Sequence, residues 1–153
     1  MTTARDLREP YRNYLASVIL FHFAAAERSG LGLTDYQASS LLDLDKRMTN
    51  GQLAARLGLS AGATTRVVDR LIDFGLARRV VDPADRRRVM IEHTGELPEE
   101  LASLLGPIRR QIGELVAALS EDQVDGLRSY FVGAAEIYGA AARNPERPGK
   151  DTP

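Results

Sequence analysis

Residues 60–66 are small, hydroxylated or cationic, which suits contact with a polyanion. If residues 61–74 form a helix, Gly62, Thr65 and Arg66 share one face, because positions three and four apart lie one above the other. An arginine at such a position can donate two hydrogen bonds to the O6 and N7 atoms of guanine. We therefore assign Thr65 and Arg66, beside the small Gly62, to the edges of DNA bases.

Phosphate groups are the second target that these residue types suit. Ser60, Thr64 and Arg70 flank the same helix face, and phosphate contacts set the register of a protein on a duplex without reading its sequence. Three consecutive arginines follow in a turn. They are Arg86, Arg87 and Arg88. These side chains suit the minor groove, where narrow A·T tracts concentrate negative potential.

Three aspartates between these arginines are expected to shape the surface rather than to contact DNA. Asp82 and Asp85 bracket the turn, where aspartate side chains accept hydrogen bonds from backbone amides two residues on. Asp69 is expected to pair with Arg78 or Arg79. These carboxylates would aim the arginine-bearing turn toward the duplex.

The distribution of charge along the chain favours a polyanionic partner, although the net charge does not. The 153 residues carry 20 lysines and arginines against 21 aspartates and glutamates, a net charge of −1. Residues 56–88 hold eight arginines against four aspartates, a balance of +4, whereas residues 92–143 hold nine acids against four arginines, a balance of −5. Opposed blocks are typical of proteins with a nucleic-acid surface. The sequence therefore predicts double-stranded DNA as a partner.

Helix and strand signals place these residues on regular elements. Capping boxes are expected where a hydroxyl residue precedes a glutamine by three positions, which occurs at Thr34–Gln37, Thr49–Gln52 and Ser120–Gln123. Ser60 is a further N-cap candidate. Apolar periodicity predicts helices over about 10–28, 35–43, 50–57, 61–74, 98–119 and 121–143, and strands over 77–81 and 88–93. Gly106-Pro107 is expected to kink or break the helix that contains it.

Two short helices separated by only three residues, then a hairpin, form a winged helix-turn-helix. The expected fold is mainly α, with a DNA-binding lobe and two-stranded β wing over residues 34–93. Long dimerisation helices are expected within 1–33 and 94–143, and the proline-containing residues 144–153 read as a disordered tail. The first helix is apolar on nearly all sides, so a second copy of the chain is its expected cover.

The chain resembles the MarR-type transcriptional regulators in its central motifs. These are Thr49-x3-Leu53-Ala54-x2-Leu57-Gly58-Leu59-Ser60, Thr64-x-Arg66-x-Val68-Asp69-x-Leu71, Gly75-Leu76-x-Arg78-Arg79 and Asp82-x-x-Asp85-x-Arg87. The resemblance implies a homodimer that places two winged lobes on a pseudopalindromic operator, and we expect it to act as a repressor. It also implies that Arg87 lies at the wing tip and reaches the minor groove.

The same resemblance implies a small-molecule effector that binds between the dimerisation helices and the winged lobe. The side chains that are candidates to line such a site are Tyr11, Tyr14, His22, Tyr36 and Met48. The alternative for each is an ordinary place in the core, because aromatic side chains at helical spacing usually pack there.

Other classes of function lack support in the sequence. The absence of cysteine excludes disulfides and thiol redox switches, and no motif indicates an enzyme, a metal site or a cofactor. The longest apolar run, residues 15–26, falls short of the ~18 residues that a membrane span needs. With no signal peptide recognised, the expected location is the cytoplasm, in association with the nucleoid. The remaining alternative is a dimeric winged-helix protein-interaction module that does not bind DNA.

Overall fold

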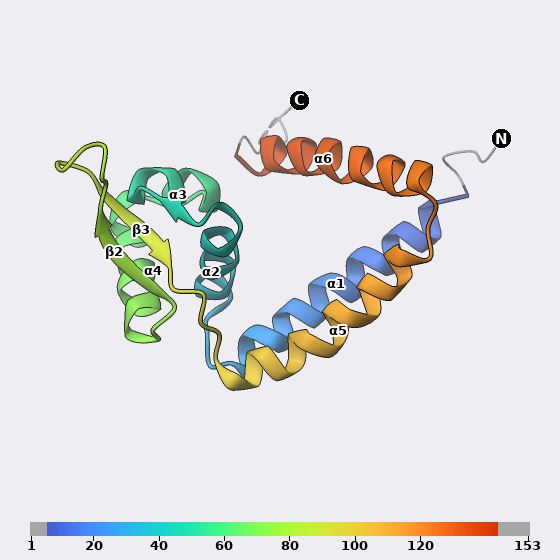
Figure 1. Ribbon diagram of the computed structural model, residues 1–153, viewed down its shortest axis with the longest axis horizontal. Helices are drawn as coiled ribbons and strands as arrows, with labels where there is room; N and C mark the ends of the chain where they lie inside the picture. The colour runs from blue at the N-terminus through green and yellow to red at the C-terminus, as the bar shows by residue number, and fades with distance from the viewer. Residues whose placement is uncertain (1–5, 144–153) are drawn as a thin grey trace, which may run out of the picture.

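The computed structural model describes residues 6–143, within which a lobe of helices and strands adjoins three long helices (Figure 1). In chain order the elements are α1 (Arg8–Arg28), α2 (Leu33–Asp45), β1 (Arg47–Met48), α3 (Asn50–Leu57), α4 (Ala61–Asp73), β2 (Ala77–Val81), β3 (Val89–His93), α5 (Glu99–Ala117) and α6 (Glu121–Arg143). The mainly helical winged fold is therefore confirmed. The expected tail, residues 144–153, lies outside the described residues.

Three of the expected helix starts are confirmed. The Thr49 hydroxyl accepts a hydrogen bond from the Gln52 amide, while the Gln52 side chain accepts one from the Thr49 amide. Ser120 and Gln123 form the same reciprocal pair before α6, and the Ser60 hydroxyl accepts from the third residue of α4. Because such bonds satisfy N–H groups that have no partner inside the helix, the local sequence sets where these helices begin.

Two expectations about the helices differ from the structure. Thr34 does not cap α2, because the helix begins at Leu33, two residues before the expected start at residue 35, and its N-cap residue is Gly32, which has no side chain to form a capping bond. The sequence Gly106-Pro107 does not break α5, which continues through Pro107. A proline removes one backbone hydrogen bond, and in a helix as long as α5 the turns on both sides keep theirs.

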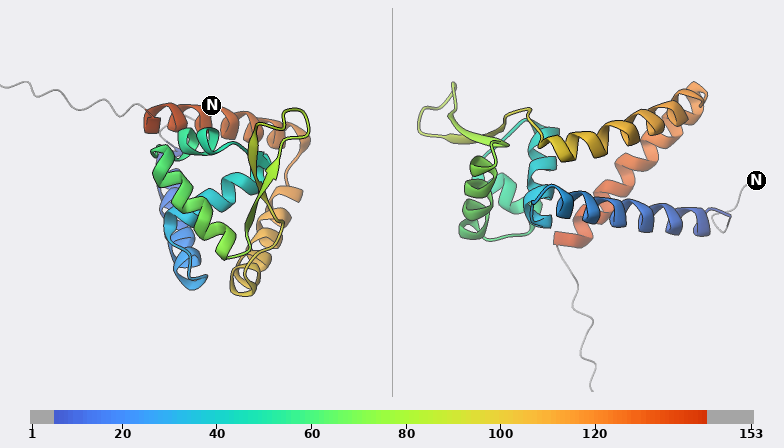
Figure 2. Two further views of the ribbon diagram at one scale, coloured as in Figure 1. Left: turned by 90° about the vertical axis from the view of Figure 1, so that its left-hand side faces the viewer. Right: turned by 90° about the horizontal axis from the view of Figure 1, so that it is seen from below.

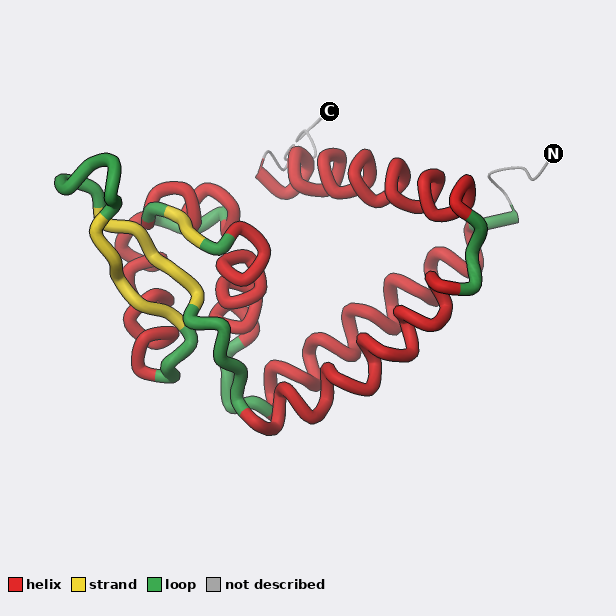
Figure 3. The backbone as a smooth tube through the Cα atoms, viewed as in Figure 1, coloured by secondary structure: helices red, strands yellow, loops and turns green. Residues whose placement is uncertain are grey.

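The sheet has a strand that the sequence analysis missed. The strand order is β1-β3-β2, with both pairings antiparallel (Figure 3). β2 and β3 form the wing hairpin in a register from Ala77↔His93 to Val81↔Val89. β1 adds only the pairs Arg47↔Glu92 and Met48↔Ile91, and two residues are too few to give an alternating pattern.

The hydrophobic core of the lobe lies between α2, α3, α4 and one face of the sheet. Its fully buried side chains include Leu42, Leu53, Val68, Leu71 and Leu76, one or more from each neighbouring segment. β2 and β3 turn Ala77 and Ile91 toward this core. The core therefore fixes the hairpin and α4 relative to each other, which is the geometry that a winged helix-turn-helix needs.

The three long helices are packed far less completely. α1 and α5 extend from one side of the lobe, and α6 turns back from their far end (Figures 1 and 2). Many large apolar side chains on these helices are exposed, among them Ile19, Leu20, Phe23, Ile112, Leu115, Val132 and Ile137. Within residues 6–143, no helix combines the length and the apolar character needed to cross a bilayer.

Candidate nucleic-acid interface

Helix α4 presents one face to the core and the other to solvent. Val67, Val68 and Leu71 are buried, because apolar residues at these spacings share one side of a helix. Gly62, Thr65, Arg66, Asp69 and Asp73 are exposed, as the spacing predicts. Only the first turns of this exposed face therefore offer small, hydroxyl and cationic groups to a partner.

Thr64 is placed differently from the expectation. Its side chain is buried, with none of its surface exposed, and its hydroxyl donates a hydrogen bond of 3.0 Å to the Ser60 carbonyl. The predicted contact between Thr64 and a phosphate is therefore wrong for this conformation, because the side chain is buried and its hydroxyl is bonded to the helix backbone. Thr65, its exposed neighbour, donates to the Ala61 carbonyl at 2.9 Å and still has an oxygen that can accept.

Arg70 is also engaged within the lobe. Its Nε and Nη2 atoms donate hydrogen bonds of 2.7 and 2.6 Å to the two carboxylate oxygens of Asp35. These bonds raise the pKa of Arg70 above its ordinary value. Two of the guanidinium nitrogens of Arg70 are therefore bonded to Asp35, and this partner on α2 was missed because it lies 35 residues away in the sequence.

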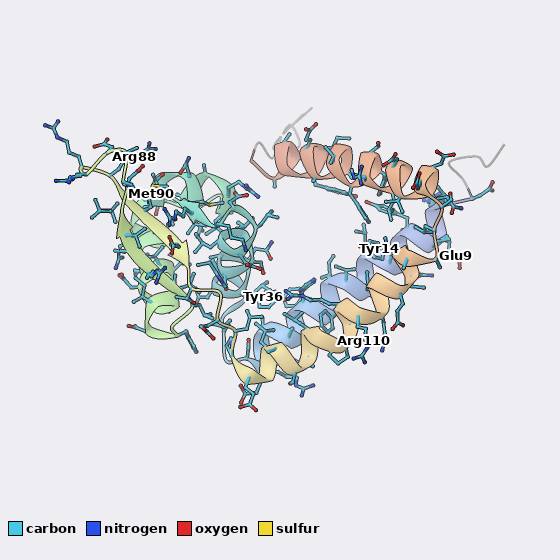
Figure 4. All side chains as sticks on the ribbon, in the orientation of Figure 1. Glu9, Tyr14, Tyr36, Arg88, Met90 and Arg110 are labelled. Carbon is cyan, nitrogen blue, oxygen red and sulfur yellow. The ribbon has the colours of Figure 1, made fainter. Side chains whose placement is uncertain are left out.

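The wing has the turn geometry that the aspartates were expected to enforce. Asp82 accepts a hydrogen bond from the Ala84 amide at 2.9 Å, and Asp85 accepts one from the Arg87 amide at 3.0 Å. The Arg88 amide donates a hydrogen bond to the Asp85 carbonyl, and the Arg88 carbonyl accepts one from the Asp82 amide, so that the loop is closed. These backbone bonds leave the guanidinium groups of the wing exposed at the edge of the lobe (Figure 4).

Two further ion-pair groups tie the wing strands to their neighbours. The predicted pairing of Asp69 is confirmed with Arg79, at 2.6 Å between Oδ1 and Nη2, and it joins α4 to β2. On the other face of the sheet, the nearly buried Glu92 binds Arg47 of β1 and Arg78 of β2. The hydrogen bond from Arg78 lowers the pKa of Glu92 below its usual range. Sequence reasoning missed Glu92 because it assigned neither the register of the hairpin, which sets Arg78 opposite Glu92, nor the strand β1, which adds Arg47.

The eight arginines of residues 56–88 therefore fall into two groups of four. One group is bonded to carboxylates, in the pairs Arg56–Asp45, Arg70–Asp35, Arg78–Glu92 and Arg79–Asp69. The other four make no ion pair or side-chain hydrogen bond within residues 6–143, and they are Arg66, Arg86, Arg87 and Arg88. The unpaired group coincides with the side chains expected to contact base edges and the minor groove.

A cavity of about 1150 Å³ lies between the lobe and the long helices, lined by α1, α2, α5 and α6. Tyr14, His22 and Tyr36 all line it, as expected, and Figure 4 shows Tyr14 and Tyr36 on the inner side of the angle between these elements. The Tyr36 hydroxyl lies 2.7 Å from Nδ1 of His22. The rest of the wall is largely aliphatic, with Arg109 and Asp43 as its charged members.

His93 forms the part of the cavity wall where the sheet joins α5. Its Nε2 lies 3.2 Å from the Ser39 hydroxyl, and its Nδ1 accepts a hydrogen bond from the Gly95 amide. Burial lowers the pKa values of His93 and His22 below the ordinary histidine value, because a charged imidazolium loses hydration there. Burial therefore favours the neutral form of both imidazoles.

Two expected cavity residues lie elsewhere. Tyr11 packs edge-on against Tyr130, and its hydroxyl contacts that of Tyr138, so it joins α1 to α6 outside the cavity. Met48 is buried in β1 opposite Ile91 and belongs to the lobe core. Met48 is thus an ordinary core residue, as the alternative interpretation of the sequence had it.

Comparisons of sequence agree with this geometry. The MarR family model matches residues 37–89, which span the helix-turn-helix and most of the wing. The HTH-type transcriptional regulator YcgE of Bacillus subtilis (strain 168) is 34% identical over 127 residues, which cover 83% of this chain and 82% of that protein.

Solved structures have the same fold at lower identity. A mutant of MepR from a multidrug resistant S. aureus clinical isolate superposes with a TM-score of 0.68 at 16% identity, over 90% of this chain and 99% of the other. NadR in complex with 4-hydroxyphenylacetate gives a TM-score of 0.59 at 16% identity, over 90% and 97%. The chain has the helix-turn-helix and the wing of this fold, and a regulator that is 34% identical to it matches most of its length. The chain therefore belongs to the MarR family of DNA-binding transcriptional regulators.

Proposed function

We propose that the protein is a homodimeric repressor that reads a pseudopalindromic operator through α4 and the wing. The observation that carries the proposal is the division of the arginines. Arg66 on α4 and three arginines of the wing are exposed and unpaired, whereas the other arginines of residues 56–88 are neutralised by carboxylates. Free guanidinium groups are the ones that can displace counterions from DNA.

Each free arginine has a distinct part in this proposal. Arg66 donates to a guanine in the major groove, with Thr65 and Gly62 against neighbouring base edges. Ser60, at the start of α4, faces a phosphate. The wing arginines enter the minor groove, while Asp69, Asp82 and Asp85 hold α4 and the wing in place through their bonds to Arg79 and the turn amides.

The dimer is proposed from the apolar surface of the long helices. Residues 34–93 would form the DNA-binding lobe, while the helices within 1–33 and 94–143 pair with those of a second copy. A soluble monomer rarely exposes contiguous apolar patches larger than a few hundred Å², and side chains such as Leu20 and Ile137 are 69% and 71% exposed. Two copies would set two lobes about one DNA turn apart, ~34–36 Å.

An effector is proposed for the cavity between the lobe and the long helices. Its aliphatic wall, the Tyr36 hydroxyl and the neutral His22 suit a small amphipathic molecule. The related NadR structure contains 4-hydroxyphenylacetate. Such a ligand would release the operator only if it binds better to a lobe spacing that does not fit DNA. A regulator of this kind acts in the cytoplasm, on the nucleoid.

The test begins with selection of bound duplexes from a random pool by the wild-type protein. Arg66→Ala should lower discrimination by about 1–3 kcal/mol at one base pair, and replacing the three wing arginines by alanine should weaken binding and flatten its dependence on salt. Arg110→Ala, which removes an exposed arginine of α5, is the matched control. No duplex binding at low salt would overturn the proposal in favour of a protein-interaction module.

A further inference from the structure

The two hydrogen bonds between Asp35 and Arg70 connect α2 directly to the DNA-facing helix α4. Asp35 lies in the first turn of α2 and is only 4% exposed, whereas the Arg70 side chain is about half exposed. Both carboxylate oxygens are used, at 2.6 and 2.7 Å. A bidentate pair of this kind fixes orientation as well as distance.

The position of Arg70 makes this link relevant to base contacts. Arg66 and Arg70 are four residues apart on α4 and therefore lie one above the other on the helix. The link to α2 thus acts one helical turn from Arg66. The other side of α4 packs on the core through Val67 and Leu71. This apolar packing limits the distance between α4 and α2, but it is compatible with small rotations of α4 about its own axis.

The charge of Asp35 is unfavourable for a surface that must approach a polyanion. A carboxylate here cancels one of the arginine charges of α4 and adds repulsion toward phosphates. Burying a carboxylate also costs free energy unless it is paired and hydrogen-bonded. An acid at this position is therefore explained by the orientation that it enforces rather than by the field that it creates.

We propose that Asp35 is a positioning residue for DNA recognition, which holds α4 through Arg70 in the orientation that lets Arg66 and Thr65 reach base edges. This inference rests on the proposed function. It reverses the simple electrostatic expectation, because removing the acid raises the positive charge of the lobe and yet weakens specific binding.

The experiment compares Asp35→Asn with Asp73→Asn, in full-length protein, on a duplex selected by the wild type and on an unrelated duplex. Asp73 is an exposed acid on α4 with no ion pair in the described part of the chain, so its replacement changes the charge alone. Asp35→Asn should lower affinity for the selected duplex about tenfold, since a charge-assisted bond is lost, and affinity for the unrelated duplex by less than twofold. Asp73→Asn should leave both unchanged or slightly tighter.

Two further measurements separate positioning from a general loss of structure. Stoichiometric titration gives the active fraction, so that an unfolded population is not counted as weak binding. Asp35→Glu, which keeps a carboxylate, should recover part of the lost affinity for the selected duplex. Arg70→Gln should lower affinity for the selected duplex while keeping the slope of log affinity against log salt, whereas loss of a phosphate contact would change that slope by about 0.9.

Each outcome decides the inference. If Asp35→Asn binds the selected duplex as tightly as the wild type or more tightly, the electrostatic expectation holds and Asp35 is not a positioning residue. If Asp35→Asn lowers the affinity for both duplexes equally, Asp35 does not act on base contacts, and the inference is overturned. If Arg70→Gln flattens the salt dependence, Arg70 contacts phosphate, and the inference is overturned as well. Failure of the wild type to bind any duplex would instead overturn the proposed function, and this inference with it.

Discussion

The lobe and the long helices bury their apolar side chains to very different extents. In the lobe, Leu42, Leu53 and Leu71 have none of their surface exposed. On α1, α5 and α6, side chains of similar size remain about half exposed or more, as Leu20, Leu115 and Ile137 do. The two regions belong to one chain and have similarly strong helix signals, so local helix formation does not account for the contrast.

This contrast indicates which contacts each region still lacks. The lobe has a closed core and leaves cationic side chains at its surface, so its missing partner is polar and negatively charged. The long helices leave apolar side chains at theirs, so their missing partner is another apolar surface. The exposed residue types therefore favour a nucleic-acid interface on the lobe and support the proposed protein interface on the long helices.

The largest effect is expected from emptying the lobe core. Leu71→Ala should lower the free energy of unfolding by about 2–5 kcal/mol, because a fully buried leucine leaves a cavity when it is truncated. Urea denaturation followed by circular dichroism measures this change. The matched control is Leu20→Ala on α1, 69% exposed in the single chain, studied at protein concentrations low enough to populate monomers. An equal loss in both variants would remove the contrast between the two regions.

The next effect concerns the long helices. Ile137→Glu should raise the dissociation constant of the dimer about 100-fold or more, because a charge would be buried where an apolar side chain is expected to pack. Sedimentation equilibrium measures this constant. Leu44 of α2 is exposed to the same extent, 71% for each residue, and Leu44→Glu should leave association unchanged. Equal association of the wild type and Ile137→Glu would contradict a role of α6 in the dimer.

A smaller effect is expected at the wing. Asp85→Ala removes the carboxylate that accepts from the Arg87 amide and should weaken operator binding by about 0.5–1.5 kcal/mol, the net worth of one hydrogen bond. Thermal stability should hardly change, because the turn is exposed. Fluorescence anisotropy with a labelled duplex provides the measurement. Tighter binding after the loss of this negative charge would show that Asp85 does not shape the wing.

The smallest effect is expected at His93, where the lobe meets α5. Because burial lowers the pKa of His93 in the folded protein, the unfolded chain takes up a proton first as the pH falls. Stability is therefore fully present above about pH 6.5, the pKa of an unfolded histidine, and declines below it. His93→Gln should make the profile of unfolding free energy against pH shallower below about pH 6.5. Parallel profiles would show that His93 makes no such contribution.

Local signals in the sequence were sufficient for most elements of this fold. α3, β2 and α6 have their expected bounds, since capping bonds such as Thr49–Gln52 and the apolar period involve residues only a few positions apart. The winged helix-turn-helix follows from their order. The start of α2 and the continuity of α5 through Pro107 depended on packing of neighbouring elements, and no local rule indicated them.

Prediction of the candidate site succeeded and failed for the same reason, because local patterns do not reveal tertiary contacts. Residue type and helix face alone predicted Arg66 and the wing arginines as DNA contacts, which stays a prediction, and residue type also predicted the carboxylate contacts of Asp82 and Asp85, which the structure confirms. Thr64 and Arg70 were assigned to phosphates because helical spacing does not reveal a buried hydroxyl or a partner on another helix. Likewise, spacing did not separate Met48 of the core from Tyr36 of the cavity wall.

The sequence by itself determined that a basic winged helix-turn-helix lies between long apolar helices, because capping, periodicity and charge are properties of short segments. Only the tertiary structure decided which arginines are free. Asp35 and Glu92 are 35 and 14 residues from the arginines Arg70 and Arg78, and such pairs exist only once α2 and the sheet are packed. The eight arginines of residues 56–88 therefore divide into four that pair with carboxylates, three of which lie outside this segment, and four that are unpaired within the described residues.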